Sequence, residues 1–265
     1  MTRRNMLATT ISGTAAFANA QESTRGGAAK RAFFELRFYY MRNSLTNQVQ
    51  RTTAFVSKTY LPAAKRAGIG PVGIFSAVIA PESPFLLVMS GYSSLAAMEA
   101  SLEKMGADAE YRKASDEFNA TRDLPYVRVE STLLRCFDSV PAIEVGPAAA
   151  GRAARTFELR TYESDNDATL QRKIKMFGDG EVAIFRKNGL QPVFFGEALI
   201  GPKLPRLTYM VAFENALAGR EKAWAAFGAD PDWQKLKVVP GLSDPDIVSN
   251  ISNIILKPVA GSEIQ

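Results

Sequence analysis

The chain has 265 residues, of which 46% are hydrophobic and 22% are charged, and this length suits one large domain or two small ones. It contains no histidine, which excludes Ser-His-Asp and Cys-His catalysis, His-ligated haem and zinc sites with histidine ligands. Cys136 is the only cysteine, so an internal disulfide and a thiolate metal cluster are excluded, and its apolar neighbours predict a buried structural thiol. The net charge of +5 is spread along the chain, so we expect no nucleic-acid partner. Without histidine and without a cluster of cysteines, we also expect no metal and no cofactor.

The first twenty residues have the layout of a bacterial export signal. Arg3-Arg4 is followed by a mildly apolar region, Leu7 to Phe17, and by the small-x-small sequence Ala18-Asn19-Ala20. This order predicts a twin-arginine signal peptide over residues 1–20 and a periplasmic or secreted protein. A disordered N-terminus with a chance Arg-Arg pair is the alternative. No later apolar stretch reaches the roughly 20 residues that span a bilayer, so we do not expect an integral membrane protein.

A flexible leader over residues 21–32 precedes the first predicted domain, residues 33–137. Alternating apolar and polar residues predict strands, and helical periodicity between caps and glycine stops predicts helices. The expected elements are a strand at 33–40, a helix at 44–66 with Ser44 as its cap, strands at 71–80 and 85–92, helices at 94–105 and 108–120, and a strand at 126–137. This β-α-β-β-α-β order is the ferredoxin-like arrangement.

A Pro/Gly/Ala-rich linker over residues 138–154 leads into a second predicted domain, residues 155–258, which repeats the first. Strands are expected at 156–162, 191–200, 206–213 and 247–256, helices at 168–188 and 216–227, and a C-terminal tail at 259–265. The repeat is visible in the letters, because Phe34-Glu35-Leu36-Arg37 recurs as Phe157-Glu158-Leu159-Arg160, 123 residues later. Further matches follow in order at offsets of 121 and 122 residues, among them Met89 with Met210.

The duplication predicts an α+β fold in which tandem ferredoxin-like repeats form an α/β-barrel within one chain. Each unit leaves one face of its sheet without helices, and two units can bury these faces against each other. From the alternation in the opening strands, we expect Phe34, Leu36 and Phe38 to meet the helices. Their polar neighbours Glu35, Arg37 and Tyr39 should then point into the barrel, as should Glu158, Arg160 and Tyr162.

The residues resemble the NIPSNAP family of the dimeric α/β-barrel superfamily, in two tandem copies. The matching features are the opening Phe-Glu-Leu-Arg-x-Tyr strand, the segment Ala223-Trp224-x-x-Phe227 followed by Asp230-Pro231-x-Trp233, and the closing Ser252-Asn253-x-x-Leu256-Lys257-Pro258. The first copy has Leu102, Met105 and Tyr111 where the second has Trp224, Phe227 and Trp233. The resemblance implies the barrel fold and little about chemistry, since members are mostly of unclear function and some act as membrane-associated partner proteins.

Polar residues of the opening strands are the candidate ligand-binding side chains: Glu35, Arg37, Tyr39, Glu158, Arg160 and Tyr162. A carboxylate and a guanidinium inside a barrel could polarise a carbonyl group or hold a carboxylate, with a phenol as proton donor. Glu158, Arg160 and Tyr162 are also the catalytic candidates. The alternative is that each Glu and Arg pair merely satisfies itself, because buried charges need partners.

The segment Gly178-Asp179-Gly180-Glu181 interrupts the long helix of the second unit, where each glycine costs about 1 kcal/mol relative to alanine. A kink there could open the barrel mouth and make Glu181 a further catalytic candidate, as a general base; a solvated loop is the alternative. Other motifs are expected to be structural: Trp224, Phe227 and Trp233 as packing anchors, Asp108 and Asp230 as helix caps, and Asp165-Asn166-Asp167 as a turn rather than a cation site.

These observations favour a barrel that binds a small hydrophobic or carbonyl compound and could transform it without metal or flavin. The competing hypothesis is a non-enzymatic interaction protein whose barrel is a scaffold. Unpaired edge strands would in addition favour a homo-oligomer.

Overall fold

The computed structural model describes residues 30–120, 123–146 and 155–265; the predicted signal peptide, most of the leader and linker residues 147–154 lie outside this range. The first half contains β1 (Phe33–Tyr40), α1 (Gln48–Phe55), the π-helical segment η1 (Val56–Tyr60), α2 (Leu61–Ala67), β2 (Val72–Ile79), β3 (Phe85–Tyr92), α3 (Leu95–Ala107), α4 (Ala109–Asn119) and β4 (Arg128–Cys136). The second half contains β5 (Thr156–Glu163), α5 (Asp167–Met176), the π-helical segment η2 (Phe177–Glu181), α6 (Val182–Lys187), β6 (Gln191–Ile200), β7 (Arg206–Phe213), α7 (Ala216–Ala229), α8 (Pro231–Leu236), α9 (Asp244–Ile247) and β8 (Asn250–Pro258).

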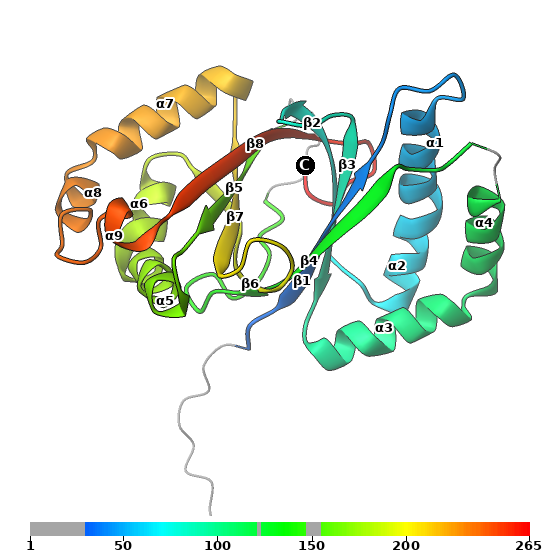
Figure 1. Cartoon of the computed structure of the whole chain (residues 1–265), viewed down its shortest axis with the longest axis horizontal. Coiled ribbons are helices and arrows are strands. Elements are labelled where there is room, and N and C mark those ends of the chain that lie inside the picture. Colours follow the sequence, from blue (N-terminus) through cyan, green and yellow to red (C-terminus); the bar gives the residue numbers. More distant parts are fainter. Residues whose placement is uncertain (1–29, 121–122, 147–154) are drawn as a thin grey trace, which may run out of the picture.

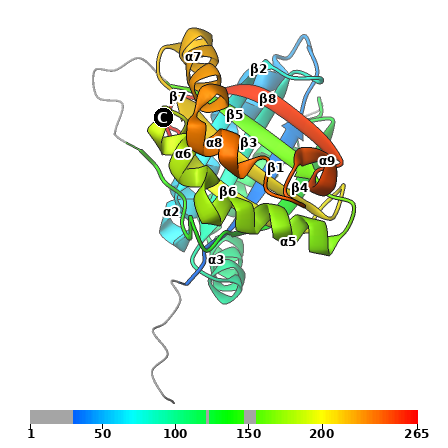
Figure 2. The ribbon, with the colours of Figure 1, turned by 90° about the vertical axis from the view of Figure 1, so that its left-hand side faces the viewer.

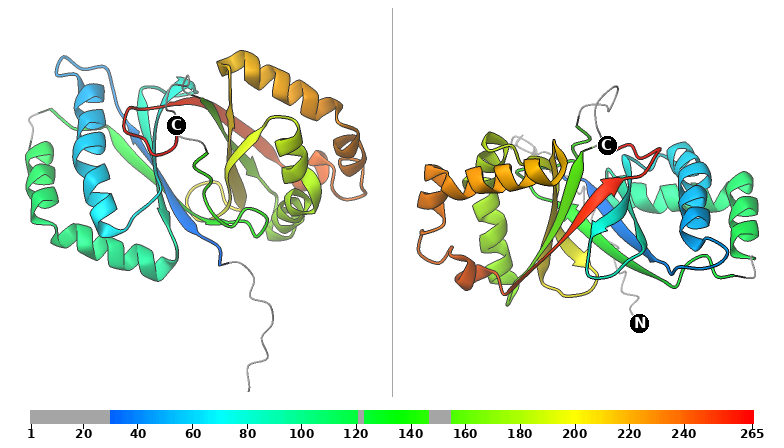
Figure 3. Two further views of the ribbon diagram at one scale, coloured as in Figure 1. Left: turned by 180° about the vertical axis from the view of Figure 1, so that it is seen from behind. Right: turned by 90° about the horizontal axis from the view of Figure 1, so that it is seen from above.

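The strands form one closed antiparallel barrel in the order β1-β3-β2-β8-β5-β7-β6-β4. Within each half, the strands keep the order of a ferredoxin-like sheet. The halves are joined at two seams, where β2 pairs with β8 and β4 pairs with β6. Figures 1 and 3 show the barrel between two groups of helices, α1–α4 on one side and α5–α9 on the other. The predicted α/β-barrel within one chain is therefore confirmed.

The barrel interior is filled by apolar side chains from both sheets. Phe34 and Leu36 of the first half and Phe157 and Leu159 of the second half belong to one buried cluster together with Phe194. The rings of Phe34 and Phe194 lie 4.4 Å apart between their centroids. The predicted assignment of faces is thus wrong, because the phenylalanines and leucines point into the barrel and not toward the helices.

The polar residues of the opening strands instead face the helices. The physical reason is that the barrel is closed. Strands surround its core on all sides, so a charged side chain there would find few partners. Between the sheet and the helices, polar side chains of the helices can pair with such a charge. Below the helices of each half lies a separate apolar cluster, built around Phe177, Phe185 and Tyr209 in the second half and around Val56 and Ile74 in the first. Figure 2 shows α5, α6 and α8 covering the second sheet.

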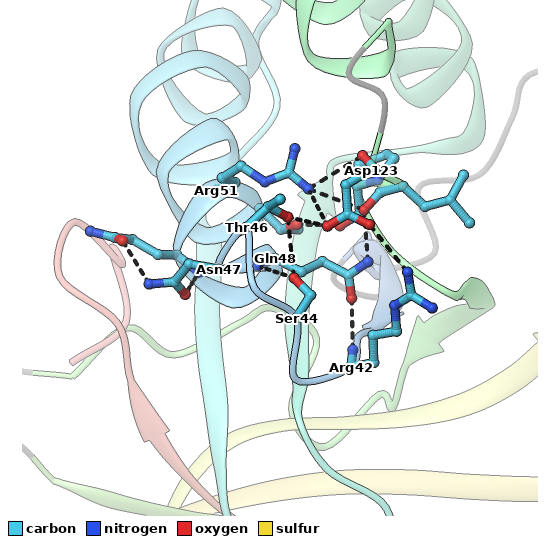
Figure 4. A network of polar contacts seen from close by, with 11 residues as sticks. Arg42, Ser44, Thr46, Asn47, Gln48, Arg51 and Asp123 are labelled. Carbon is cyan, nitrogen blue, oxygen red and sulfur yellow. Dashed lines mark hydrogen bonds and ion pairs between the residues drawn. The ribbon is translucent and has the colours of Figure 1, made fainter.

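The long helix of the first half begins at Gln48 and not at Ser44. Asn47 has left-handed backbone angles, and its side chain accepts a hydrogen bond from the N–H of Gln50, which makes Asn47 the cap. Ser44 contributes by accepting a hydrogen bond from the N–H of Gln48 over 3.1 Å. Figure 4 shows Arg42, Thr46 and Arg51 converging on Asp123, so the start of α1 is tied to the segment before β4.

The C-terminal residues are part of the fold, although a simple tail was predicted. The Oγ of Ser262 accepts a hydrogen bond from the N–H of Ile74 over 2.9 Å, and the side chain of Ile264 is buried in the barrel core. The Nε of Arg155, just before β5, donates to the carbonyl oxygen of Gln265 over 2.6 Å. The C-terminal segment therefore closes the end of the barrel at which β5 begins.

Candidate functional site

Glu158 is the centre of a polar network between the second sheet and α7. Its carboxylate is completely buried and accepts hydrogen bonds from Arg160 at 2.9 Å, from Arg220 at 2.7 and 2.8 Å, from the Trp224 indole N–H at 2.8 Å and from Asn253 at 2.9 Å. Trp224 was predicted to be only a packing anchor, and its hydrogen bond to Glu158 was missed. Arg220 was not predicted as a site residue, and Asn253 was named only as part of the closing-strand motif.

This environment keeps Glu158 ionised. Burial by itself would raise the pKa of the carboxyl group, but the hydrogen bonds from Arg220 and Asn253, the charge of Arg160 and the Trp224 N–H outweigh it and lower the pKa to about 2. A carboxylate with so low a pKa and so many donors is a weak base. The arrangement therefore braces α7 against β5 and β8.

The equivalent network of the first half has fewer charges. Glu35 accepts from the Arg37 guanidinium at 2.8 Å and from the Oγ of Ser131 at 2.5 Å, and the ring of Tyr39 lies edge-on to that of Tyr126. Met98 and Leu102 occupy the positions 122 residues before Arg220 and Trp224. The structure thus brings Glu35, Arg37 and Tyr39 together, as predicted, but without the second guanidinium and the indole of the other half.

Glu181 lies in η2, at the interruption of the long helix, and is 2% exposed, so the alternative of a solvated loop is wrong. Its carboxylate pairs with the Nζ of Lys173 at 3.1 Å, and the rings of Tyr162, Phe177 and Trp233 surround that amine. Burial raises the pKa of Glu181, and the charge of Lys173 opposes this shift. The kink is part of the long helix, and Glu181 lies between this helix and the sheet, away from the barrel interior. Glu181 therefore does not line a barrel mouth.

A cavity of about 180 Å³ lies inside the barrel, at the end where β1 and β5 finish. Its walls come from both halves. The apolar lining residues are Leu36, Phe38, Tyr40, Phe85, Leu159 and Ile254. Thr132, Thr161 and Thr208 supply hydroxyl groups, and Arg206 supplies a guanidinium.

Arg206 is the charged side chain that the sequence reasoning missed. It is 9% exposed, and its Nη2 donates to the Oγ1 of Thr132 over 2.7 Å, across the two halves. Its Nε is buried and has no hydrogen-bond partner in the described part of the chain. Desolvation lowers the pKa of Arg206, and the charge of Glu163 opposes that shift. A sequence signal did exist, because Arg206 opens an otherwise apolar strand at the position where the first repeat has Phe85.

Among residues 30–120, 123–146 and 155–265, no three acidic, histidine or cysteine side chains gather closely enough to hold an ion. Cys136 is buried as predicted, and burial raises the pKa of its thiol to about 12, so it is a poor nucleophile. Within the same part of the chain, every helix is too short or too polar to cross a lipid bilayer.

Residues 157–263 match the family model described as NIPSNAP. The second half of this chain is therefore similar to the NIPSNAP family. It contains Glu158, Arg160, Arg206, Arg220 and Trp224, whereas the aromatic wall of the barrel cavity belongs to the first half. The sequence comparison with curated proteins gave no match.

Solved structures share the barrel over most of the chain. A putative monooxygenase from Lactobacillus acidophilus NCFM has a TM-score of 0.58 and 9% identity, covering 86% of this chain and 94% of that chain. A putative monooxygenase from Fusobacterium nucleatum has a TM-score of 0.54 and 8% identity, covering 87% and 93%. A NIPSNAP family protein of unknown function from Agrobacterium tumefaciens has 24% identity and a TM-score of 0.38, covering 42% and 95%. At these identities, the likeness of the first two structures shows a shared fold.

Proposed function

We propose that this protein binds a small organic molecule in the barrel cavity between its two halves. The observation that carries the proposal is the composition of the cavity wall. One side is aromatic, with Phe38 and Phe85 in edge-to-face contact at 5.3 Å between ring centroids, and the other side carries hydroxyl groups and a guanidinium. A mostly apolar pocket with a few convergent polar groups is the usual form of a small-molecule site.

The proposal gives the polar networks under the helices a positioning role. Glu158, Arg160 and Tyr162 hold α7 on the sheet, and the Glu181–Lys173 pair holds the long helix, so the barrel strands keep their register. Leu159 and Thr161 alternate with these residues along β5 and line the cavity from the opposite face. Their positions are fixed by the network on the other side of the same strand.

We also propose that the protein is exported by the twin-arginine route. Arg3-Arg4, the apolar region and Ala18-Asn19-Ala20 support this proposal from the sequence. A periplasmic location would restrict the ligand to compounds that reach that compartment.

Native mass spectrometry of the protein purified from its own periplasm tests both proposals together. We expect a chain that begins at Gln21 and carries additional, non-covalently held mass. Ser252→Trp, which places an indole at the cavity lining, should lose the additional mass, whereas Ala225→Trp, on the exposed side of α7, should keep it.

The outcomes separate the two proposals. A chain that keeps residues 1–20 and stays in the cytoplasm would refute export. Absence of retained mass in the wild type, or equal retention by Ser252→Trp, would refute binding in the barrel cavity.

A further inference from the structure

Arg206 carries a charge whose partner is missing from the described protein. Among the described residues, no carboxylate lies within 4.0 Å of its guanidinium, and the Nε is buried without an acceptor. Nearby acids are already engaged: Glu163 accepts from Lys203 at 3.3 Å and from Asn250 at 2.9 Å. An unpaired buried charge is unfavourable, so a group that pairs with it gains binding energy.

The other charged groups of the cavity already have ion-pair partners. Glu82 and Glu130 line its rim, and both pair with Arg128, at 2.6 and 2.8 Å. At the opposite rim, the amine of Lys203 is paired with Glu163. Among the charged side chains that line the cavity, the guanidinium of Arg206, beside the threonine hydroxyl groups, is therefore the one without an ion-pair partner in the described part of the chain.

The two halves place different side chains at equivalent positions of the cavity wall. Arg206 pairs with Glu163 in the register between β7 and β5, and Phe85 pairs with Tyr40 in the same register between β3 and β1. The repeat thus places a cation on one side and an aromatic ring on the equivalent side. A ligand that satisfies both sides has one negative group and an apolar body.

We propose that the cavity selects organic monocarboxylates with a compact apolar body, with Arg206 as the residue that recognises the carboxylate. This inference rests on the proposed function. A guanidinium presents parallel N–H donors that match the two oxygens of a carboxylate. The hydroxyl group of Thr132 holds the guanidinium in place from the other half, and Phe38, Phe85 and Leu159 face the body of the ligand.

Calorimetric titration of the purified protein with two probes of matched shape tests the inference. The probes are 3-phenylpropionate and 3-phenylpropan-1-ol, which differ in the carboxylate. We expect the wild type to bind the acid at least tenfold more tightly than the alcohol. Arg206→Met should lower the affinity for the acid to near that of the alcohol and leave the alcohol within about twofold.

Two further variants keep the test decisive. Arg206→Gln retains a hydrogen-bond donor for Thr132 without the charge, and it should lose the preference for the acid even where Arg206→Met fails to fold. Arg186→Met removes an exposed guanidinium of α6 that pairs with Glu144. This variant should leave both affinities unchanged.

The outcomes distinguish this inference from the proposed function. Equal binding of acid and alcohol by the wild type, or an acid preference that survives in Arg206→Gln, would overturn the inference and leave binding in the cavity standing. Binding of neither probe would overturn both.

Discussion

At the scale of single residues, Glu158 shows how a buried charge stabilises the fold under the helices. The pKa of a glutamate in the unfolded chain is near 4.5, and in the folded protein that of Glu158 is lowered to about 2. The folded state therefore binds its proton less tightly than the unfolded state does. Its contribution to stability is fully present above pH 4.5 and is lost as the pH falls toward 2.

Glu158→Gln should lower the free energy of unfolding by about 3 kcal/mol at pH 7, because it leaves the partly buried Arg160 and Arg220 without their common counter-charge. The difference between wild type and variant should shrink between pH 4.5 and pH 2. Urea unfolding followed by circular dichroism at several pH values measures both effects.

Glu35→Gln is the matched control in the first half, where Met98 stands in place of the second guanidinium. Its cost should be smaller than that of Glu158→Gln. A cost for Glu158→Gln that does not change with pH would show that lost packing, and not lost charge, destabilises the variant.

At the scale of elements, both long helices contain a π-helical segment at equivalent places, η1 at Val56–Tyr60 and η2 at Phe177–Glu181. The first segment contains no glycine, so a π-helical turn forms there without one. In the second segment, Gly180 has non-helical backbone angles, with a φ of 173° and a ψ of −29°. The wider turn directs one buried polar side chain toward the sheet in each half: Tyr60, whose hydroxyl group bonds to that of Ser90 at 2.7 Å, and Glu181.

Gly178→Ala should therefore stabilise the protein by about 0.5–1 kcal/mol, since alanine restricts the unfolded chain and favours helix. A Cβ at this position would meet the Cβ of Ser139 at 3.7 Å, which is an ordinary contact. Gly189→Ala should destabilise by about 1 kcal/mol, because Gly189 ends the helix with a φ of +83°. Thermal unfolding of both variants measures the shifts, and destabilisation by Gly178→Ala would contradict this account.

At the scale of the whole molecule, the barrel has one closed end and one end with a cavity. The C-terminal segment inserts Ile264 into the core at the closed end. Gly73 leaves room there for the ring of Phe75 and for Ile264, since a Cβ would lie 2.6 Å from the Cε2 of Phe75 and 3.2 Å from the Cδ1 of Ile264. The apolar core of the barrel is shared by both halves. Neither half could bury its own inner sheet face alone.

Ile264→Ala should lower the free energy of unfolding by about 2–4 kcal/mol, as expected for a fully buried isoleucine. The barrel should still unfold in a single transition, because its core is common to both halves. Denaturant unfolding followed by both fluorescence and circular dichroism measures this. Two separated transitions would show that the halves fold independently.

The repeat and the local signals of the chain predicted the order of the elements closely. The bounds expected for the strands at 85–92 and 206–213 are those observed, and Asp108 and Asp230 cap helices as expected. These features depend on residues close in sequence, whose hydrogen bonds and periodicity can be read from the letters. The short helix α9 was missed, since Asp244–Ile247 is too brief to show a period.

The sequence by itself thus determined that two β-α-β-β-α-β units exist and that they pair into a barrel. Only the tertiary structure decided which face of each strand points inward. An alternating pattern shows that the two faces of a strand differ, but it does not show which of them faces the barrel core. It also decided the chemistry: Arg220 reaches Glu158 across 62 positions, and Arg206 reaches Thr132 across 74. Such contacts arise when distant strands and helices meet, and no local pattern specifies them.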